Sequence, residues 1–261
     1  MVPAHNEQRL LPRMLGRVPA WVDGVVVVDD ASGDGTYASA EAHGEPRVHL
    51  IRHEQNQGVG AAIRTGYRCA LGSGADLVVV MAADDQMDPD DLPRLLEPLI
   101  SGVADYAKGN RLLHASAARM PIGRRVAAHV LGRATAIATG YKISDSQCGY
   151  TAITAGALRR LELSELWPRY GYPNDLLGLA ARAKLRVTEV PVTAVYADEQ
   201  SGIRPWHFFS VAWLIGRRWA RERARTQSTT GNPSDRCSAA PQPDAAPSQR
   251  AALDPTRDVA S

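Results

Sequence analysis

The stretch Val25-Val26-Val27-Val28-Asp29-Asp30-Ala31-Ser32-Gly33-Asp34-Gly35-Thr36 decides the fold. Its four valines are not interrupted by a polar residue, so the pattern predicts a strand that is buried on both faces. The acidic, glycine-containing loop that follows leads into a predicted helix at 36–43. A buried strand followed directly by a helix is the repeating unit of a parallel sheet.

The same alternation of strand and helix continues along the chain. Strands are predicted at 47–51 and 77–81, and helices at 61–71 and 89–100. This order predicts an α/β fold with a doubly wound, mostly parallel sheet and helices on both faces. Beyond residue 105 the weaker pattern predicts helices at 126–139 and 175–183, a turn-rich segment at 145–154, and strands at 186–190 and 193–196.

The last 36 residues differ from the rest in composition. Residues 226–261 contain five prolines and seven alanines but no Phe, Tyr or Trp. Such a segment buries too little apolar surface to offset an ordering entropy of roughly 1–2 kcal/mol per residue. We therefore predict a folded part at 1–225 and a disordered tail at 226–261.

The charge balance and the cysteines exclude several classes of protein. Thirty Lys and Arg residues against 28 Asp and Glu residues leave a net charge of +2, which argues against a dedicated nucleic-acid binder. The three cysteines have no ligand spacing, so neither a zinc site nor a disulfide scaffold is predicted, and a reducing compartment fits best. The chain starts without a signal-peptide pattern, and its apolar runs are too short to cross a bilayer. We expect a cytoplasmic protein.

Polar loops follow three strands: a first strand that is barely present at the start of the chain, the strand at Val25–Val28 and the strand at 77–81. The loops are Pro3-Ala4-His5-Asn6-Glu7, the loop from Asp29 to Thr36, and Ala82-Ala83-Asp84-Asp85-Gln86. Ligands of such sheets bind beyond the carboxyl ends of the strands, so these loops predict a ligand site at one edge.

A glycine pair at Gly58 and Gly60 resembles part of a dinucleotide-binding fingerprint. The third glycine position is occupied by Ile63, and the segment does not open the first strand–helix unit. We therefore interpret the pair as packing or capping glycines and reject an oxidoreductase.

The acidic run that starts at Asp84 is not a calcium loop. Its sixth position is Pro89 rather than glycine, and its twelfth is Leu95 rather than glutamate. On an extended segment Asp84 and Gln86 point the same way, so we expect them to share one Mg²⁺ or Mn²⁺ ion. Such a cation offsets the charge of a diphosphate leaving group. The later acids, Asp88, Asp90 and Asp91, are predicted to cap and charge the N-terminus of the next helix.

Four motifs in order resemble a known family. They are 3–7, Val28-Asp29-Asp30-Ala31-Ser32-Gly33-Asp34-Gly35-Thr36, Asn56-Gln57-Gly58-Val59-Gly60 and Asp84-Asp85-Gln86-Met87-Asp88-Pro89. They are similar to the motifs of family-2 inverting glycosyltransferases of the GT-A fold, closest to the dolichyl/polyprenyl-phosphate mannosyl- and glucosyltransferase branch. Asp145-Ser146-Gln147-Cys148-Gly149-Tyr150 and the segment 196–204 resemble later motifs of that branch. The resemblance covers residues 1–205, which we expect to form the catalytic domain.

The resemblance implies a role for each matching residue. Asp84 and Asp145 are the implied catalytic residues, Asp145 beside the sugar and acceptor. Asp84 and Gln86 are the implied ligands of the metal and diphosphate. Arg111 is expected to bind phosphate, for which a planar guanidinium is well suited. The residues implied to line the nucleotide-sugar site are Pro3, His5, Glu7, Val28, Asp30, Ala82, Ala83, Asp84, Arg111 and Arg204.

Within that set the implied contacts are more specific. Asp30 is expected to hydrogen-bond the base with Val28 packed beside it, and Arg204 to close over the diphosphate from a mobile loop. His5 stands where the family usually has tyrosine.

Two departures from the family pattern stand out. Ala82 occupies the position of an acid two residues before Asp84, which predicts weaker metal binding. The chain also begins at the first motif, so most of the first strand is expected to be missing.

The segment 206–225 bears on the acceptor. It contains three tryptophans and runs from an aromatic half into an arginine-rich half, which is typical of an amphipathic helix on an anionic membrane surface. A core-packing helix with a solvated basic end explains the pattern equally well. An acceptor phosphate is already anionic and needs no strong base, whereas a hydroxyl needs one, for which Asp145 is a candidate.

We hypothesise that the chain transfers a hexosyl group from a nucleotide-diphospho-sugar to a polyprenyl-type phosphate, with inversion. The partners implied are the sugar donor, a lipid-phosphate acceptor and peripheral contact with the cytosolic membrane face. The alternatives are a soluble transferase acting on a glycan or small-molecule hydroxyl, and an inactive nucleotide-sugar-binding scaffold.

Overall fold

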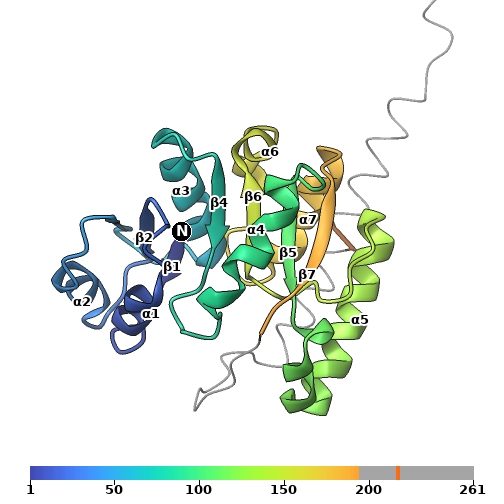
Figure 1. Ribbon diagram of the computed structural model, residues 1–261, viewed down its shortest axis with the longest axis horizontal. Helices are drawn as coiled ribbons and strands as arrows, with labels where there is room; N and C mark the ends of the chain where they lie inside the picture. Colours follow the sequence, from blue (N-terminus) through green and yellow to red (C-terminus); the bar gives the residue numbers. More distant parts are fainter. Residues whose placement is uncertain (194–215, 218–261) are drawn as a thin grey trace, which may run out of the picture. The chain divides into compact units, whose positions relative to one another are not determined.

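The computed structural model of the chain describes residues 1–193 and 216–217. Its strands form two hydrogen-bonded sets (Figure 1). The first set, in the order β1-β2-β3, is parallel and consists of β1 (Val2–Ala4), β2 (Val25–Asp29) and β3 (Val48–Arg52). The second set, in the order β4-β6-β5-β7, consists of β4 (Leu77–Val80), β5 (Tyr106–Asn110), β6 (Thr151–Thr154) and β7 (Val187–Pro191).

Met1 joins the two sets of strands. Its amino group donates to the Val79 carbonyl at 2.6 Å, and its carbonyl accepts from the Met81 amide at 3.1 Å. This is the bonding pattern of parallel neighbours, so β1 lies beside β4 in the same direction. The strands therefore follow one another in the order β3-β2-β1-β4-β6-β5-β7.

The strand β6 runs antiparallel to both of its neighbours, β4 and β5. The prediction of a mostly parallel sheet is confirmed with this one exception. The prediction of turns throughout 145–154 is wrong at Thr151–Thr154, and β5 was not predicted at all. Both strands are short, and β5 carries the polar residues Lys108 and Asn110 in the interior, so neither shows the apolar run that marks β2.

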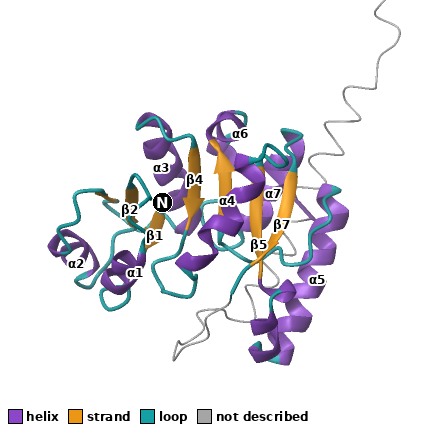
Figure 2. Ribbon diagram, in the orientation of Figure 1, coloured by secondary structure: helices purple, strands orange, loops and turns teal. Residues whose placement is uncertain are grey.

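Seven α-helices connect the described strands (Figure 2). They are α1 (Leu11–Arg17), α2 (Thr36–Ala42), α3 (Val59–Gly72), α4 (Leu92–Ile100), α5 (Ile122–Thr139), α6 (Ala155–Arg159) and α7 (Tyr172–Arg182). Short 3₁₀ turns lie at η1 (Pro89–Asp91), η2 (Arg111–Leu113), η3 (Ala115–Arg119) and η4 (Leu163–Glu165). The five predicted helices are confirmed with shifted ends, whereas α1 and α6 were not predicted.

The two faces of the sheet carry separate apolar clusters. Val25 and Val27 of β2 point into the cluster that α1 and α4 complete, and Val26 and Val28 point toward α3 on the other face. All four valines are buried, which confirms the prediction from the opening stretch. A strand covered on both faces has no need of polar alternation.

Close packing explains the glycines at the start of α3. A Cβ on Gly60 would lie 2.1 Å from the Trp167 carbonyl oxygen, and one on Gly58 would lie 2.5 Å from the Pro168 carbonyl oxygen. The Pro168 oxygen also accepts from the Ala61 amide at 3.0 Å, which satisfies one of the unpaired donors of the first turn. The interpretation as packing glycines is confirmed.

Several predictions fall outside the described residues. They include nearly all of the strand at 193–196, Arg204, the tail at 226–261 and the helix at 206–225, of which only Gly216 and Arg217 are described, both as helix. Within the described part of the chain, no helix combines the length and the apolarity that a membrane span requires.

We predict that Gly60→Ala lowers the free energy of unfolding by about 2 kcal/mol, because the added methyl group meets backbone that cannot move aside. Gly72→Ala, at the open end of the same helix, is the matched control: nothing lies within 4 Å of its added Cβ. That variant should gain about 0.5 kcal/mol through helix propensity. Urea unfolding followed by circular dichroism compares them, and equal midpoints would contradict the packing role.

Candidate active site

One edge of the sheet collects nearly all of the predicted site residues. The strands β1 to β5 and β7 share one direction, so the loops that follow β1, β2, β3, β4 and β5 emerge at this edge. Because β6 runs the opposite way, it begins at this edge, and the loop before it joins the others. This explains how Asp145, which precedes a strand, meets residues that follow strands.

Asp30 fastens the loop after β3 to the end of β2. Its Oδ1 accepts from the Gln57 amide at 2.9 Å and lies 2.7 Å from His53 Nδ1. Its Oδ2 accepts from the Gly58 amide at 2.7 Å. Asp30 is 3% exposed, so both oxygens are engaged within the protein. Asp30 therefore has a structural role that the sequence did not predict. Its hydrogen bond to the base of the nucleotide stays a prediction.

The loop after β1 lies against the loop after β2. His5 Nδ1 lies 2.9 Å from the Asp30 carbonyl oxygen, and the Glu7 amide donates to Thr36 Oγ1 at 2.8 Å. The His5 side chain is exposed and Pro3 is partly exposed. Val28 is fully buried in the cluster with Val26 and Ala62, so it lies behind this surface rather than on it.

A cavity of about 420 Å³ opens beyond β2 and β3. Its lining residues are Ala31, Ser32, Arg52, His53 and Glu54. This cavity lies directly beside Asp30 and its hydrogen bonds to His53, Gln57 and Gly58, which we call the Asp30 clamp. It is on the side of the sheet edge where the resemblance predicts the nucleotide.

The loop after β4 is a turn rather than the extended segment that we expected. Asp85 has a left-handed backbone with φ +56°. The prediction that Asp84 and Gln86 point the same way from an extended segment is therefore wrong. Instead the two residues close a small loop in which Asp84 Oδ1 accepts from the Gln86 amide at 3.1 Å. Ala82 is partly exposed and Ala83 is buried in the core.

Asp85 ties this loop to α1. It is 6% exposed and pairs with Arg13 at 2.8 Å and with Arg17 at 2.9 Å, and Arg17 also reaches Asp88. Both carboxylate oxygens of Asp85 are therefore paired with arginines.

Asp88 and Asp91, which come later in the acidic run, have different roles. Asp88 caps η1 by accepting from the Asp90 amide, which confirms its predicted role. Asp91 stands at the N-cap position of α4, as predicted, but its side chain makes no capping hydrogen bond there. It is buried, accepts from the Thr193 amide at 2.6 Å and pairs with Arg94.

The donor set after β4 fits a cation that is bound together with a diphosphate. No group of three or more His, Cys, Asp or Glu side chains that could hold a metal occurs among residues 1–193 and 216–217. Magnesium-type sites need only one or two protein oxygens when phosphates and water supply the rest. The Asp84 carboxylate and the Gln86 amide oxygen meet that requirement, while Ala82 adds nothing to it.

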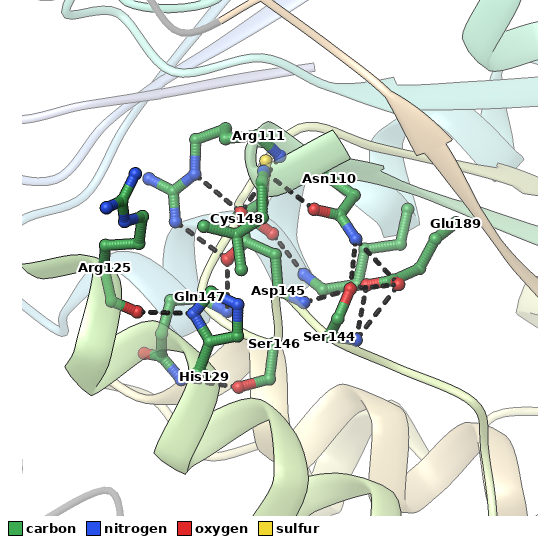
Figure 3. A network of polar contacts seen from close by, with 12 residues as sticks. Asn110, Arg111, Arg125, His129, Ser144, Asp145, Ser146, Gln147, Cys148 and Glu189 are labelled. Carbon is green, nitrogen blue, oxygen red and sulfur yellow. Dashed lines mark hydrogen bonds and ion pairs between the residues drawn. The ribbon is translucent and has the colours of Figure 1, made fainter. Parts of the chain in front are cut away.

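Arg111 and Asp145 form a two-bond ion pair at the end of β5 (Figure 3). Arg111 Nε donates to Asp145 Oδ2 at 2.8 Å, and Nη2 donates to Oδ1 at 2.9 Å. The Arg111 amide donates to Oδ2 as well, at 3.1 Å. Burial by itself raises the pKa of the Asp145 carboxyl, but the Arg111 charge and these hydrogen bonds outweigh it and hold that pKa below its usual value.

Glu189 of β7 holds the loop that carries Asp145 (Figure 3). Its Oε1 accepts from the Asp145 amide at 2.9 Å, and its Oε2 accepts from Ser144 Oγ at 2.9 Å and from Asn110 Nδ2 at 2.8 Å. The carboxylate therefore satisfies donors from β5 and from the loop before β6 at once. Nothing in the spacing of the sequence connects Glu189 with residue 145, and it was not predicted.

Lys108 fixes the other end of the same loop. It is fully buried in β5, directly opposite Glu189 in the register of β7, and its Nζ donates to the Cys148 carbonyl. Burial lowers the pKa of Lys108, while the nearby Asp145 and Glu189 charges act in the opposite direction. A lysine within a buried strand would have indicated a functional role for Lys108, but the sequence did not predict β5 as a strand.

The Asp145 loop also contacts the loop after β4. The Tyr150 hydroxyl donates to the Asp88 carbonyl at 3.0 Å, and a Cβ on Gly149 would lie 3.5 Å from Met87 Cε. The structure thus brings Asp84, Gln86, Arg111 and Asp145 onto adjoining loops of one sheet edge.

Comparison with known proteins gives one family. A model of the family described as "Glycosyl transferase family 2" matches residues 1–161. The chain is 33% identical over 237 residues to an undecaprenyl-phosphate mannosyltransferase of Micrococcus luteus, covering 86% of this chain and 97% of the relative. It is 31% identical over 214 residues to a UDP-N-acetylglucosamine–dolichyl-phosphate N-acetylglucosaminyltransferase of Methanococcus voltae, covering 76% of this chain and 85% of the relative.

Solved structures share the fold. Glucosyl-3-phosphoglycerate synthase from Mycobacterium tuberculosis in complex with UDP superposes with a TM-score of 0.64 at 21% identity, over 84% of this chain and 78% of that one. The same enzyme with Mn²⁺, UDP-glucose and phosphoglyceric acid gives a TM-score of 0.62 at 20% identity, over the same shares of the two chains. The α/β fold of GT-A type expected from the sequence is confirmed.

We predict that Glu189→Ala lowers the free energy of unfolding by about 3 kcal/mol, because several donors that face Glu189 lose their acceptor. Glu165→Ala, which removes the exposed pair with Arg182, is the matched control and should cost about 0.5 kcal/mol. Chemical denaturation measures both. A Glu189 variant as stable as the control would show that the hydrogen bonds of Glu189 contribute nothing to the stability of the fold.

Proposed function

Because this chain belongs to glycosyl transferase family 2, we propose that it transfers a hexosyl group from a nucleotide-diphospho-sugar to a polyprenyl-type phosphate with inversion. The chain is a glycosyltransferase, and the acceptor is the part of the proposal that rests on its relatives. Those of Micrococcus luteus and Methanococcus voltae are named for undecaprenyl phosphate and dolichyl phosphate. Contact with the cytosolic face of a membrane follows if the acceptor is such a lipid.

The observation that carries the proposal is the Arg111–Asp145 pair. A guanidinium held by a buried carboxylate at the strand-end edge is oriented without losing its charge, which suits it to an anionic oxygen. A phosphate acceptor needs no strong base to attack the anomeric carbon. Asp145 is fully buried, bound to Arg111 and more acidic than usual, so it is poorly placed to take a proton. We therefore assign Asp145 as a positioning residue for Arg111.

The remaining assignments concern the donor. Asp84 and Gln86 would hold a divalent cation with the diphosphate, and such a cation neutralises the charge of the leaving nucleotide. His5 and Glu7, on the loop beside the Asp30 clamp, and the cavity at Ala31 and Ser32 would receive the nucleoside. These assignments place the donor along β1, β2 and β4 and the acceptor phosphate at β5.

Transfer to lipid tests the function. The full chain is incubated with Mn²⁺, a polyprenyl phosphate and labelled UDP-glucose, UDP-N-acetylglucosamine or GDP-mannose, and the label is counted after extraction into organic solvent. We expect label in the organic phase with one donor. Asp84→Asn should reduce transfer by about 100-fold, whereas Asp90→Asn, an exposed acid of the same run, should leave it unchanged. Transfer only to water-soluble hydroxyl acceptors, or to none, would overturn the proposal.

The pH dependence of transfer tests the role of Asp145. Because its pKa lies below the usual value of about 3.9, the carboxylate stays ionised from about pH 5 to 9 and should contribute no acidic limb to the rate. Asp145→Asn should raise the acceptor KM about tenfold by releasing Arg111 and should leave the shape of the pH profile unchanged.

Asp105→Asn is the control for that measurement. Asp105 forms a similar two-bond pair with Arg186, but it precedes β5 and lies at the opposite edge of the sheet. Its loss should change neither KM nor the pH profile. An acidic limb in the wild type that disappears in Asp145→Asn would assign Asp145 as the base instead.

A further inference from the structure

Two arginines on one face of α1 reach the loop after β4. Arg13 and Arg17 stand four residues apart, so they extend from the same side of the helix. Arg13 pairs with Asp85 Oδ2 at 2.8 Å, and Arg17 pairs with Asp85 Oδ1 at 2.9 Å. We call these three residues the Asp85 cluster. The buried residues of α1 lie on its opposite side and are Leu11, Met14 and Leu15. The core therefore fixes the helix from which both arginines extend.

Asp85 needs these partners for two physical reasons. Its side chain is buried, and a carboxylate removed from water is stable only when it is paired. Its backbone is left-handed, a conformation that is uncommon outside glycine and persists where the surroundings hold it. The two arginines bind both carboxylate oxygens and so fix this conformation. Without them we expect Asp85 to turn toward water and the loop to change its course.

The turn at Asp85 controls how its two neighbours are arranged. Asp84 and Gln86, the proposed ligands of the cation, flank Asp85 directly, and Asp84 Oδ1 accepts from the Gln86 amide at 3.1 Å. Arg17 also pairs with Asp88 at 2.8 Å, so α1 holds the loop at a second point. The Asp85 cluster therefore acts on the loop from the side of α1, through the backbone of the turn rather than through contact with the cation.

The helix α1 is also attached to the loops that would receive the nucleoside. The Glu7 carbonyl oxygen accepts from the Leu11 amide at 2.9 Å, at the start of the helix. The Glu7 amide donates to Thr36 Oγ1 at 2.8 Å. Gln8 Oε1 accepts from the Gly35 amide at 3.1 Å. One helix thus connects the loops after β1 and β2 with the loop after β4.

We propose that Arg13 and Arg17 are positioning residues for the cation site. Acting through Asp85, they hold the loop after β4 in the turn that presents Asp84 and Gln86 to a divalent cation. This inference rests on the proposed function, which assigns those two ligands. A purely electrostatic role predicts the opposite sign: an arginine charge repels a cation, so removing it would tighten cation binding. Loss of a positioned turn weakens that binding instead.

Nucleotide binding with and without Mn²⁺ tests the positioning role. The full chain is titrated calorimetrically with GDP and with UDP, in the presence and in the absence of Mn²⁺. The gain in nucleotide affinity on adding Mn²⁺ equals, by linkage, the gain in Mn²⁺ affinity on adding nucleotide. Arg13→Met/Arg17→Met should reduce this gain about tenfold, as is usual when residues that orient metal ligands are lost. The affinity without Mn²⁺ should change by less than about twofold, because both arginines are exposed and their charges are screened.

Arg94→Met is the matched control. Arg94 pairs with Asp91 of the same acidic run, but it lies beyond the turn, so this variant should bind as the wild type does. Arg17→Lys keeps the charge but lacks the planar fork that binds Asp85 and Asp88 together, so it should lose about threefold of the gain. Should Arg13→Met/Arg17→Met not fold, Arg17→Lys decides the question by itself, since a full gain in that variant would overturn the proposal.

Asp85→Asn tests whether the cluster acts as one unit. Asparagine tolerates the left-handed backbone but offers no charge to the arginines. Combined with Arg13→Met/Arg17→Met, this substitution should reduce the Mn²⁺ gain no further, because the three residues act through one contact. Losses that add would show that Asp85 acts independently of α1 and would overturn the proposed route.

The remaining outcomes separate this proposal from the function on which it rests. If Arg13→Met/Arg17→Met keeps or exceeds the wild-type gain, or loses affinity equally with and without Mn²⁺, the positioning role is overturned and the proposed function stands. If Mn²⁺ gives the wild type no gain with either nucleotide, the assignment of Asp84 and Gln86 as cation ligands fails, and the positioning role fails with it.

Discussion

The chain places a carboxylate where water cannot reach it, and much of the site depends on how that charge is compensated. Asp145 is fully buried, so its charge requires a partner and hydrogen bonds within the protein. Arg111 supplies both through two parallel bonds. Removing either member leaves the other uncompensated, so the two residues form one unit.

The surroundings of this pair explain why it is rigid. Glu189 binds the start of the Asp145 loop and Lys108 binds its end, so the loop is tied to two strands of the sheet. Lys108 and Glu189 face each other across β5 and β7, and their opposite charges add to those of the pair. Arg111 is thus one of four buried or partly buried charges of balanced sign at this edge of the sheet. A preorganised cation of this kind interacts with an anionic ligand without further rearrangement.

The loops at this edge form two groups that are each held together by their own hydrogen bonds. The loops after β1, β2 and β3 are bound to one another through Asp30, His5 and Ser32. The loops at β4, β5 and β6 are bound through Tyr150 and the Arg111–Asp145 pair. Arg17 of α1 links the two groups by its bonds to Asp85 and Asp88. A donor along the first group and an acceptor at the second would then meet near β4.

The sequence by itself determined the α/β class, the buried strand at Val25–Asp29, and the strand-end loops that gather the site, because these depend on local periodicity and on motif spacing. Only the tertiary structure decided the reversed direction of β6, the hydrogen bonds from Glu189 and Lys108 to the Asp145 loop, and the turn that sets Asp85 apart from Asp84. Each of these depends on which distant segment lies alongside. A four-residue strand has no pattern that reveals its direction, and a buried lysine or glutamate looks in the sequence like any solvated charge.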